Sequence, residues 1–320
     1  MRAPLCLLGL LLALALAACG ASGGAGGSGG GRGAVEVVAT TTQLGDIVRQ
    51  VAGGAARVTQ ILRPNSDPHT YEPRPSDVEA LAGARVVFLS GDGLDRWIGK
   101  VLDAAGGNPD VVTLADFNVA HVRGETSGPE ASAEDPHWWH DPRNVEAAIP
   151  AIRDALTRAN PAARALYAAN AAAYLAKLKA LDAGIARCFA AVPPAQRKLV
   201  TDHDAFNYFA RRYGIAIVGA VIPSQTTAAE PSAGEVAQLV RTIEREHVKA
   251  VFPETSVNAK LANAIARETG AASGYTLYGD TLGPAGSAGA TYLTMERANA
   301  DAMVRGFTGG RRGCPARPPR

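Results

Sequence analysis

Short apolar segments alternate with amphipathic segments along the first half of the chain. Four apolar segments read as buried strands, at residues 35–40, 57–62, 86–90 and 111–114. The segments between them have the spacing and the glycine or proline boundaries of helices, at residues 44–53, 75–84 and 94–106. Strands that alternate with helices of this length predict parallel βαβ units, with helices on both faces of a sheet.

The alternation stops in the middle of the chain. Residues 115–136 are polar and contain glycine and proline, which predicts a long exposed loop. A helix is expected from Pro142 to about Ala159, and a longer one over residues 161–192. The apolar residues of the longer helix step alternately by four and three: Tyr167, Ala171, Tyr174, Leu178, Leu181, Ile185 and Cys188. A helix of this length extends about 45 Å, which is more than the width of one domain, so we interpret it as a connection between two lobes.

The alternation resumes after Pro193 and Pro194. Strands are expected at 198–202, 215–222, 249–254 and 272–278, and helices at 205–213, 232–247, 259–269 and 291–306. The predicted fold class is therefore α/β, with two lobes of parallel sheet flanked by helices and bridged by one long helix. The expected parts are an N-terminal α/β lobe at 34–160, the bridging helix at 161–192, a C-terminal α/β lobe at 193–308 and a tail at 309–320.

The N-terminus has the pattern of a targeting segment. One arginine precedes an apolar run from Leu5 to Ala18, which is short for a membrane span. The sequence Leu-Ala-Ala-Cys that ends it resembles a bacterial lipoprotein signal, with a signal peptide at 1–18 and the lipid on Cys19. A plain signal peptide with a chance cysteine is the alternative. Residues 19–33 are a Gly/Ser tether. We therefore expect an extracytoplasmic protein, anchored by lipid to the cell membrane on the periplasmic or cell-surface side.

The charge distribution and the cysteines give information about binding partners and about a disulfide bond. The chain has 32 Lys and Arg against 30 Asp and Glu, scattered without a basic stripe, which argues against a nucleic-acid partner. Cleavage and lipidation would leave Cys188 and Cys314 in an oxidising compartment, where a disulfide between them is favoured over two free thiols.

Three of the six histidines follow predicted strands or precede predicted helices. His69 lies in a loop with Pro68, Pro73 and Pro75, which lowers the entropy lost when its side chain is fixed. His137 lies in DPHWWHDP, and His203 ends the first strand of the second lobe. Asp280 ends the last strand of that lobe. Because ligands bind beyond the carboxyl ends of parallel strands, these four residues are expected to meet between the lobes. Three imidazoles and one carboxylate form a four-coordinate site suited to Zn²⁺.

Other polar residues are candidates for supporting roles. Carboxylates at Asp202, Asp204 and Glu254 are candidates to orient the imidazole rings. His140 is an alternative ligand to His137, but the flanking prolines disfavour the helix that would place both rings together. His121, in the long polar loop, is expected to contact a metal only transiently.

The segments PHTYEPRPSD, DPHWWHDP, TDHDAFNYFARRYGI and YGDTL occur in this order. Together they resemble the zinc and manganese receptors of bacterial ABC transporters, over about residues 35–307. The resemblance implies two α/β lobes joined by one long helix, ligands at the four residues above, and delivery of the metal to an ABC permease. Manganese members commonly have glutamate where this chain has His203, so the resemblance favours zinc over manganese.

Two departures from the family leave questions open. Zinc members often have a long histidine-rich insertion where this chain has residues 116–137 with His121 alone before the ligand. One hypothesis is that this loop gates the cleft or docks a metal-delivering partner protein. The other departure is His140, where an apolar or amide residue is expected, so the choice between His137 and His140 stays open.

Rival functions predict different features. A secreted zinc hydrolase needs a general base and an open coordination position, but the chain has no HEXXH motif and Asp280 would close the site, so no enzyme is expected. A receptor for an iron chelate predicts aromatic and arginine residues in the cleft. An adhesin-like lipoprotein with a structural metal predicts unfolding when the metal is removed.

Overall fold

The computed structural model describes residues 34–127 and 131–314, which lie in one compact unit. The predicted signal peptide, Cys19, the tether up to residue 33 and residues 315–320 of the tail lie outside the described residues. Among the described residues, no helix combines the length and the apolar composition that crossing a membrane requires.

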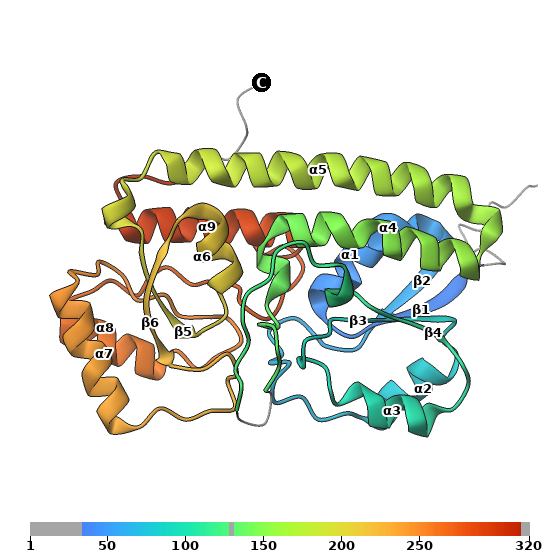
Figure 1. Ribbon diagram of the computed structural model, residues 1–320, viewed down its shortest axis with the longest axis horizontal. Coiled ribbons are helices and arrows are strands. Elements are labelled where there is room, and N and C mark those ends of the chain that lie inside the picture. Colours follow the sequence, from blue (N-terminus) through green and yellow to red (C-terminus); the bar gives the residue numbers. More distant parts are fainter. Residues whose placement is uncertain (1–33, 128–130, 315–320) are drawn as a thin grey trace, which may run out of the picture. The chain divides into compact units, whose positions relative to one another are not determined.

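The first lobe is built on a four-stranded parallel sheet with strand order β2-β1-β3-β4. Its strands are β1 (Val35–Ala39), β2 (Ala56–Gln60), β3 (Val86–Leu89) and β4 (Asp110–Thr113). Its helices are α1 (Thr42–Ala52), α2 (Pro75–Ala82), α3 (Ile98–Ala105) and α4 (Pro142–Ala159). Alternate residues of β1 face opposite sides: Val37 packs in the cluster with α1 and α4, and Val38 in the cluster with α2 and α3. Helices therefore cover both faces of the sheet, as predicted (Figure 1).

The second lobe has less regular strands than the sequence predicts. A parallel pair is formed by β5 (Lys198–His203) and β6 (Ala216–Ile222). The segments predicted as strands at 249–254 and 272–278 pair through single parallel bridges, Thr201 to Phe252, Ala250 to Ala272 and Glu254 to Leu277. The prediction of regular strands is wrong for both segments; within 249–254, Pro253 has no N–H with which to continue a ladder to the neighbouring segment. The helices of this lobe are α6 (Asn207–Tyr213), α7 (Ala233–Arg245), α8 (Lys260–Thr269) and α9 (Tyr292–Thr308).

The long helix α5 (Arg164–Ala190) has 27 residues and extends about 40 Å. It follows a short 3-10 turn at Pro161–Ala163, so it begins slightly later than predicted. Every residue of the predicted apolar stripe is buried. The helix packs against α1 and α4 of the first lobe and against α6 and α9 of the second (Figure 1). One cluster of buried side chains extends from β1 through α5 to α9, so the two lobes share a core.

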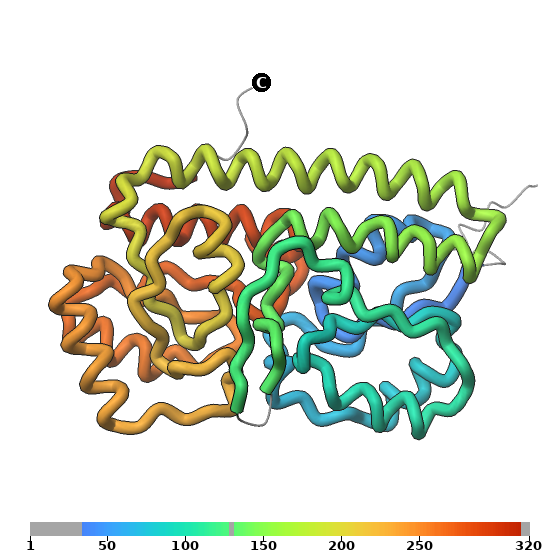
Figure 2. The backbone as a smooth tube through the Cα atoms, in the orientation of Figure 1, coloured from blue at the N-terminus to red at the C-terminus, as the bar shows by residue number. Residues whose placement is uncertain are grey.

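The segment between β4 and α4 is more ordered than an exposed loop. Short 3-10 turns lie at Ala115–Phe117 and Trp138–His140, and Arg123 pairs with Glu134 in an antiparallel bridge. Asp135 is fully buried. In Figure 2 this segment runs between the lobes, next to the chain of the second lobe. The expectation of an exposed loop is therefore wrong for its inner part, because its polar side chains bond to the second lobe.

Cys188 and Cys314 form a disulfide, with Cα atoms 5.4 Å apart. Cys188 lies near the end of α5, and Cys314 follows α9. The bond fastens the end of the chain to the long helix.

Candidate metal centre

His69 lies in a loop whose backbone is held by a side-chain hydrogen bond and flanked by prolines. The carboxylate of Asp67 accepts a hydrogen bond from the His69 backbone N–H at 2.9 Å, which closes a tight turn around Pro68. Pro75 then occupies the first turn of α2, where a missing N–H carries no penalty. The imidazole of His69 is fully buried.

His137 is held by the same local arrangement. Asp135 Oδ1 accepts a hydrogen bond from the His137 backbone N–H at 2.9 Å and lies 2.7 Å from ring atom Nδ1. The other oxygen, Oδ2, accepts a hydrogen bond from the side chain of Asn207 in the second lobe at 3.0 Å. With Nδ1 engaged by a carboxylate, Nε2 of His137 is left to face the space between the lobes.

His203 is the last residue of β5, at the carboxyl end of the strand. Glu254 Oε1 accepts a hydrogen bond from its backbone N–H at 3.0 Å and lies 3.1 Å from ring atom Nδ1. Asp202 does not contact the ring: its carboxylate accepts from the Glu254 backbone N–H at 2.6 Å. Glu254 therefore orients the imidazole, and Asp202 orients Glu254.

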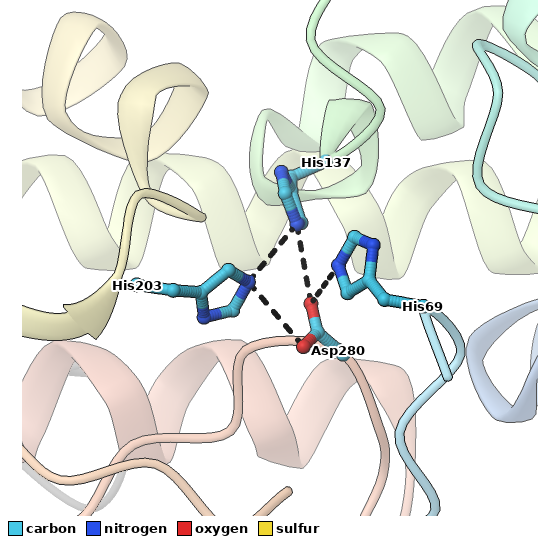
Figure 3. Close-up of side chains that lie close together, drawn as sticks. All are labelled: His69, His137, His203 and Asp280. Carbon is cyan, nitrogen blue, oxygen red and sulfur yellow. Dashed lines mark hydrogen bonds and ion pairs between the residues drawn. The ribbon is translucent and has the colours of Figure 1, made fainter. Parts of the chain in front are cut away.

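The Nε2 atoms of the three histidines converge with the carboxylate of Asp280 (Figure 3). One donor atom from each residue lies within 4.8 Å of every other. Nε2 of His203 is 3.3 Å from Nε2 of His137 and 3.4 Å from Oδ2 of Asp280. Oδ1 of Asp280 is 3.2 Å from His137 and 3.8 Å from His69. All four side chains are completely buried. The four residues predicted from the strand ends therefore lie together between the lobes.

In the cluster, burial and neighbouring charges shift the pKa values of the imidazoles and the carboxylate in opposite directions. Burial alone lowers the pKa of His137, but Asp135 and Asp280 outweigh it and raise the pKa above its ordinary value. Burial likewise lowers the pKa of His203, and Asp280 with Glu254 raises it well above the ordinary value. Burial raises the pKa of Asp280, but the three histidines hold that pKa well below its ordinary range. The carboxylate is thus ionised and attracts positive charge, whether a proton or a metal ion.

Converging imidazole nitrogens with one carboxylate are a donor set for a divalent transition metal. The sequence model of the zinc-uptake complex component A, periplasmic, matches residues 37–306. The chain belongs to this family. It is an extracytoplasmic metal-binding receptor for ABC uptake, and several relatives are named as substrate-binding lipoproteins of metal ABC transporters, which confirms the expectation that it is not an enzyme.

Relatives of this receptor are named for different metals. The manganese-binding lipoprotein MntA of Halalkalibacterium halodurans is 32% identical over 86% of this chain and 89% of its own. The iron-binding protein YfeA of Yersinia pestis is 32% identical over 85% of this chain and 86% of its own. The solved structure of the periplasmic zinc-binding protein TroA from Treponema pallidum aligns with a TM-score of 0.78 at 30% identity, covering 86% of this chain and 99% of that one. The two-lobe fold bridged by a long helix is confirmed by this match.

The other predicted site residues lie outside the cluster. His140 turns away from it, with Nδ1 2.8 Å from Glu296 and Nε2 3.1 Å from the Gly279 carbonyl, so His137 is the histidine that reaches the centre. The side chain of His121 is 59% exposed and pairs with Glu134 at 3.6 Å. The backbone carbonyl of Asp204 accepts a hydrogen bond from the side chain of Asn207, which also donates to Asp135.

Two further residues that shape the site are not predicted from the sequence. One is Asp135, the carboxylate partner of His137. The signal was present as a repeat, because Asp67-Pro68-His69 and Asp135-Pro136-His137 have the same spacing. Gly279 was also missed. A Cβ at this position would lie 2.1 Å from Glu254 Oε2 and 3.6 Å from His203 Cε1, so the close packing requires glycine.

Proposed function

We propose that the receptor captures Zn²⁺ through His69, His137, His203 and Asp280 and delivers it to an ABC permease. The observation that carries this proposal is the spacing of the donor atoms. A tetrahedral zinc ion with bonds of about 2.0 Å has ligand atoms about 3.3 Å apart. Nε2 of His137 lies 3.3 Å from Nε2 of His203, and Asp280 lies 3.2 Å from His137 through Oδ1 and 3.4 Å from His203 through Oδ2. His69 lies 3.8 Å from Asp280 Oδ1, so its imidazole has to move towards the other donors to complete the tetrahedron.

The chemistry of the donors supports zinc over manganese. Imidazole nitrogen suits zinc and other late transition metals, whereas manganese prefers carboxylate, carbonyl and water oxygens. Three of the four residues in the cluster are histidines. Relatives named for manganese, iron and zinc have similar identity to this chain, so the donor set is the better guide to the metal.

A manganese receptor is the second candidate. Both carboxylate oxygens of Asp280 face the histidines, with Oδ1 towards His137 and Oδ2 towards His203. A bidentate carboxylate would raise the coordination number to five, which a larger and harder cation accepts more readily than zinc.

Metal competition tests the proposal. Purified, chelator-stripped protein is offered equal Zn²⁺ and Mn²⁺, bound metal is counted per chain, and the measurement is repeated with His203→Glu. We expect one zinc and little manganese, with a shift towards manganese in the variant. Preference for manganese in the unsubstituted protein would contradict the zinc assignment. Loss of the fold when the metal is stripped would indicate a structural metal in place of cargo.

The setting of the receptor follows from its sequence. We infer lipidation at Cys19 and a tether at residues 19–33. The tether leads to the first lobe at 34–160, the bridging helix at 161–192 and the second lobe at 193–308. Lipidation predicts that Cys19→Ser moves the protein from the membrane fraction to the soluble fraction, and an unchanged distribution would contradict the anchor.

The segment at residues 115–136 is proposed to dock a metal-delivering partner protein. Deletion of residues 120–133 tests this: the rate of zinc loading should fall, and an unchanged rate would contradict the docking role.

A further inference from the structure

A buried pair of one histidine and one carboxylic side chain lies next to the four clustered residues. His140 and Glu296 are both fully buried, and His140 Nδ1 is 2.8 Å from Glu296 Oε1. His140 comes from the 3-10 turn before α4, and Glu296 comes from α9. The imidazole also stacks on Phe206 with ring centroids 4.5 Å apart. Burying such a pair has a desolvation cost that an apolar pair of similar size would avoid. The contact that could offset this cost is the one made by the other ring nitrogen of His140, Nε2.

Nε2 of His140 lies 3.1 Å from the carbonyl oxygen of Gly279. A carbonyl oxygen can only accept, so Nε2 must carry a proton and donate it. The proton between Nδ1 and Glu296 then belongs to one atom or the other, and Nε2–H is present in both cases. Burial raises the pKa of Glu296, and His140 partly offsets this. Glu296 thus fixes the imidazole in the orientation and protonation that the Gly279 carbonyl needs.

The Gly279 carbonyl is held by a second donor from the same segment. The indole N–H of Trp139 donates to it at 3.3 Å. Gly279 belongs to the second lobe and immediately precedes Asp280. On its other side it packs against Glu254, with an added Cβ only 2.1 Å from Oε2. The peptide unit between Gly279 and Asp280 is therefore clamped from both sides, and its plane sets the direction of the Asp280 carboxylate.

We propose that His140 and Glu296 are positioning residues that fix the Asp280 carboxylate through the Gly279 carbonyl. The proposal rests on the proposed function, in which Asp280 binds the metal. In the DPHWWHDP motif the first histidine then supplies a ligand atom, and the second fixes the ligand that the opposite lobe supplies. Loss of the pair would leave a metal site with all four donors present but with Asp280 free to rotate away from the histidines, so bound metal would dissociate faster.

The test compares four variants of the full-length chain: His140→Leu, Glu296→Gln, the double variant His140→Leu with Glu296→Leu, and His247→Asn as a matched control. His247 is an exposed histidine of the second lobe with a φ of 51°, a conformation that asparagine also tolerates. Each protein is loaded with Zn²⁺, and dissociation is followed after addition of excess chelator. Melting temperature without metal and the visible spectrum of the Co²⁺-loaded protein are recorded in parallel.

We expect His140→Leu to release zinc about tenfold faster, at the lower end of the effect of residues that orient a ligand. Its Co²⁺ spectrum should change because the carboxylate geometry changes. Glu296→Gln should stay within about twofold of the unsubstituted protein, because the amide can donate to Nδ1 and Nε2–H keeps its bond to Gly279. His247→Asn should match the unsubstituted protein in all three measurements.

The double variant separates positioning from stability. It removes both polar partners together, so it should recover melting temperature relative to His140→Leu while still releasing zinc fast. Recovery of slow release in the double variant, or a normal release rate in His140→Leu, would overturn the proposal. If the unsubstituted chain binds no zinc, the zinc assignment fails on its own, and the same comparison with Mn²⁺ decides the positioning role.

Discussion

Asp67 and Thr227 lie on opposite lobes, and the Thr227 hydroxyl donates to Asp67 Oδ2 at 2.6 Å. The other oxygen of Asp67 accepts from the His69 backbone N–H. One carboxylate therefore shapes the turn that presents His69 and ties that turn to the second lobe. Asp135 acts in the same way for His137, with Asn207 as its partner across the lobes. The two Asp-Pro-His turns are thus coupled to the relative position of the lobes.

Removal of the Thr227 hydroxyl should speed metal release. Thr227→Val keeps the size of the side chain but loses the bond to Asp67, leaving the His69 turn intact. We expect dissociation about tenfold faster, because a hydrogen bond to a charged group contributes about 1.5 kcal/mol at the low end of its range. Chelator chase measures the rate, and Thr227→Ser, which restores the hydroxyl, is the control. Equal rates for the valine and serine variants would show that this bond does not retain the metal.

Addition of one methyl group at Gly279 should disturb His203. In Gly279→Ala the new Cβ would meet Glu254 Oε2 at 2.1 Å, so the carboxylate must move away from the ring nitrogen that it orients. We expect metal affinity to fall about tenfold, as for other carboxylates that orient a metal-binding histidine. Gly274→Ala is the control, since nothing lies within 4 Å of a Cβ there. Competition titration against a chelator of known affinity gives both values. Similar affinities in the two variants would contradict the role of Glu254.

The pH dependence of stability should differ between the metal-free and the loaded protein. The pKa values of His137 and His203 are raised in the folded state by neighbouring carboxylates that outweigh burial. Protons held this way stabilise the metal-free fold fully below about pH 6.5, and this contribution is lost as pH rises through the raised values. Metal binding needs neutral imidazoles, so its contribution grows over the same range.

Melting curves with and without zinc between pH 5 and 9 test this. The melting temperature of the metal-free protein should fall as pH rises above 6.5, and the increase caused by zinc should grow with pH. Zinc retention should weaken under mildly acidic conditions. Retention that is unchanged down to pH 5 would argue against a site of three histidines.

The disulfide should matter for stability and not for metal binding. Cys188 and Cys314 are 126 residues apart, so the bond closes a long loop in the unfolded chain. Cys314→Ser together with Cys188→Ser should lower the free energy of unfolding by about 2–4 kcal/mol. The bond joins α5 to the segment that follows α9, and neither supplies any of the clustered donor atoms. Denaturant unfolding and zinc counting are the two measurements. A loss of zinc stoichiometry in the folded double variant would be the contradicting result.

Much of the site was predictable because its four main residues occupy positions that local patterns mark. The apolar segments gave the strands, and His203 stands at the end of one of them. The supporting contacts were not predictable from local patterns. His140 and Glu296 are separated by 156 residues, and Thr227 and Asp67 by 160. Contacts of that kind leave no periodicity in the sequence, since they depend on how the two lobes pack. At Pro253 a local pattern was misleading: the apolar residues favour a regular strand, but the missing N–H of the proline interrupts the ladder.

The fluorescence of Trp139 should report whether a metal ion occupies the site. The indole ring lies 5.5 Å from the ring of His137, and its N–H bonds to the peptide that precedes Asp280. Filling the centre replaces imidazole protons with a divalent cation within a few ångströms of that ring, and indole emission responds to such a change in the local electric field. The rates of metal entry and exit can therefore be followed on the unlabelled protein by its intrinsic fluorescence.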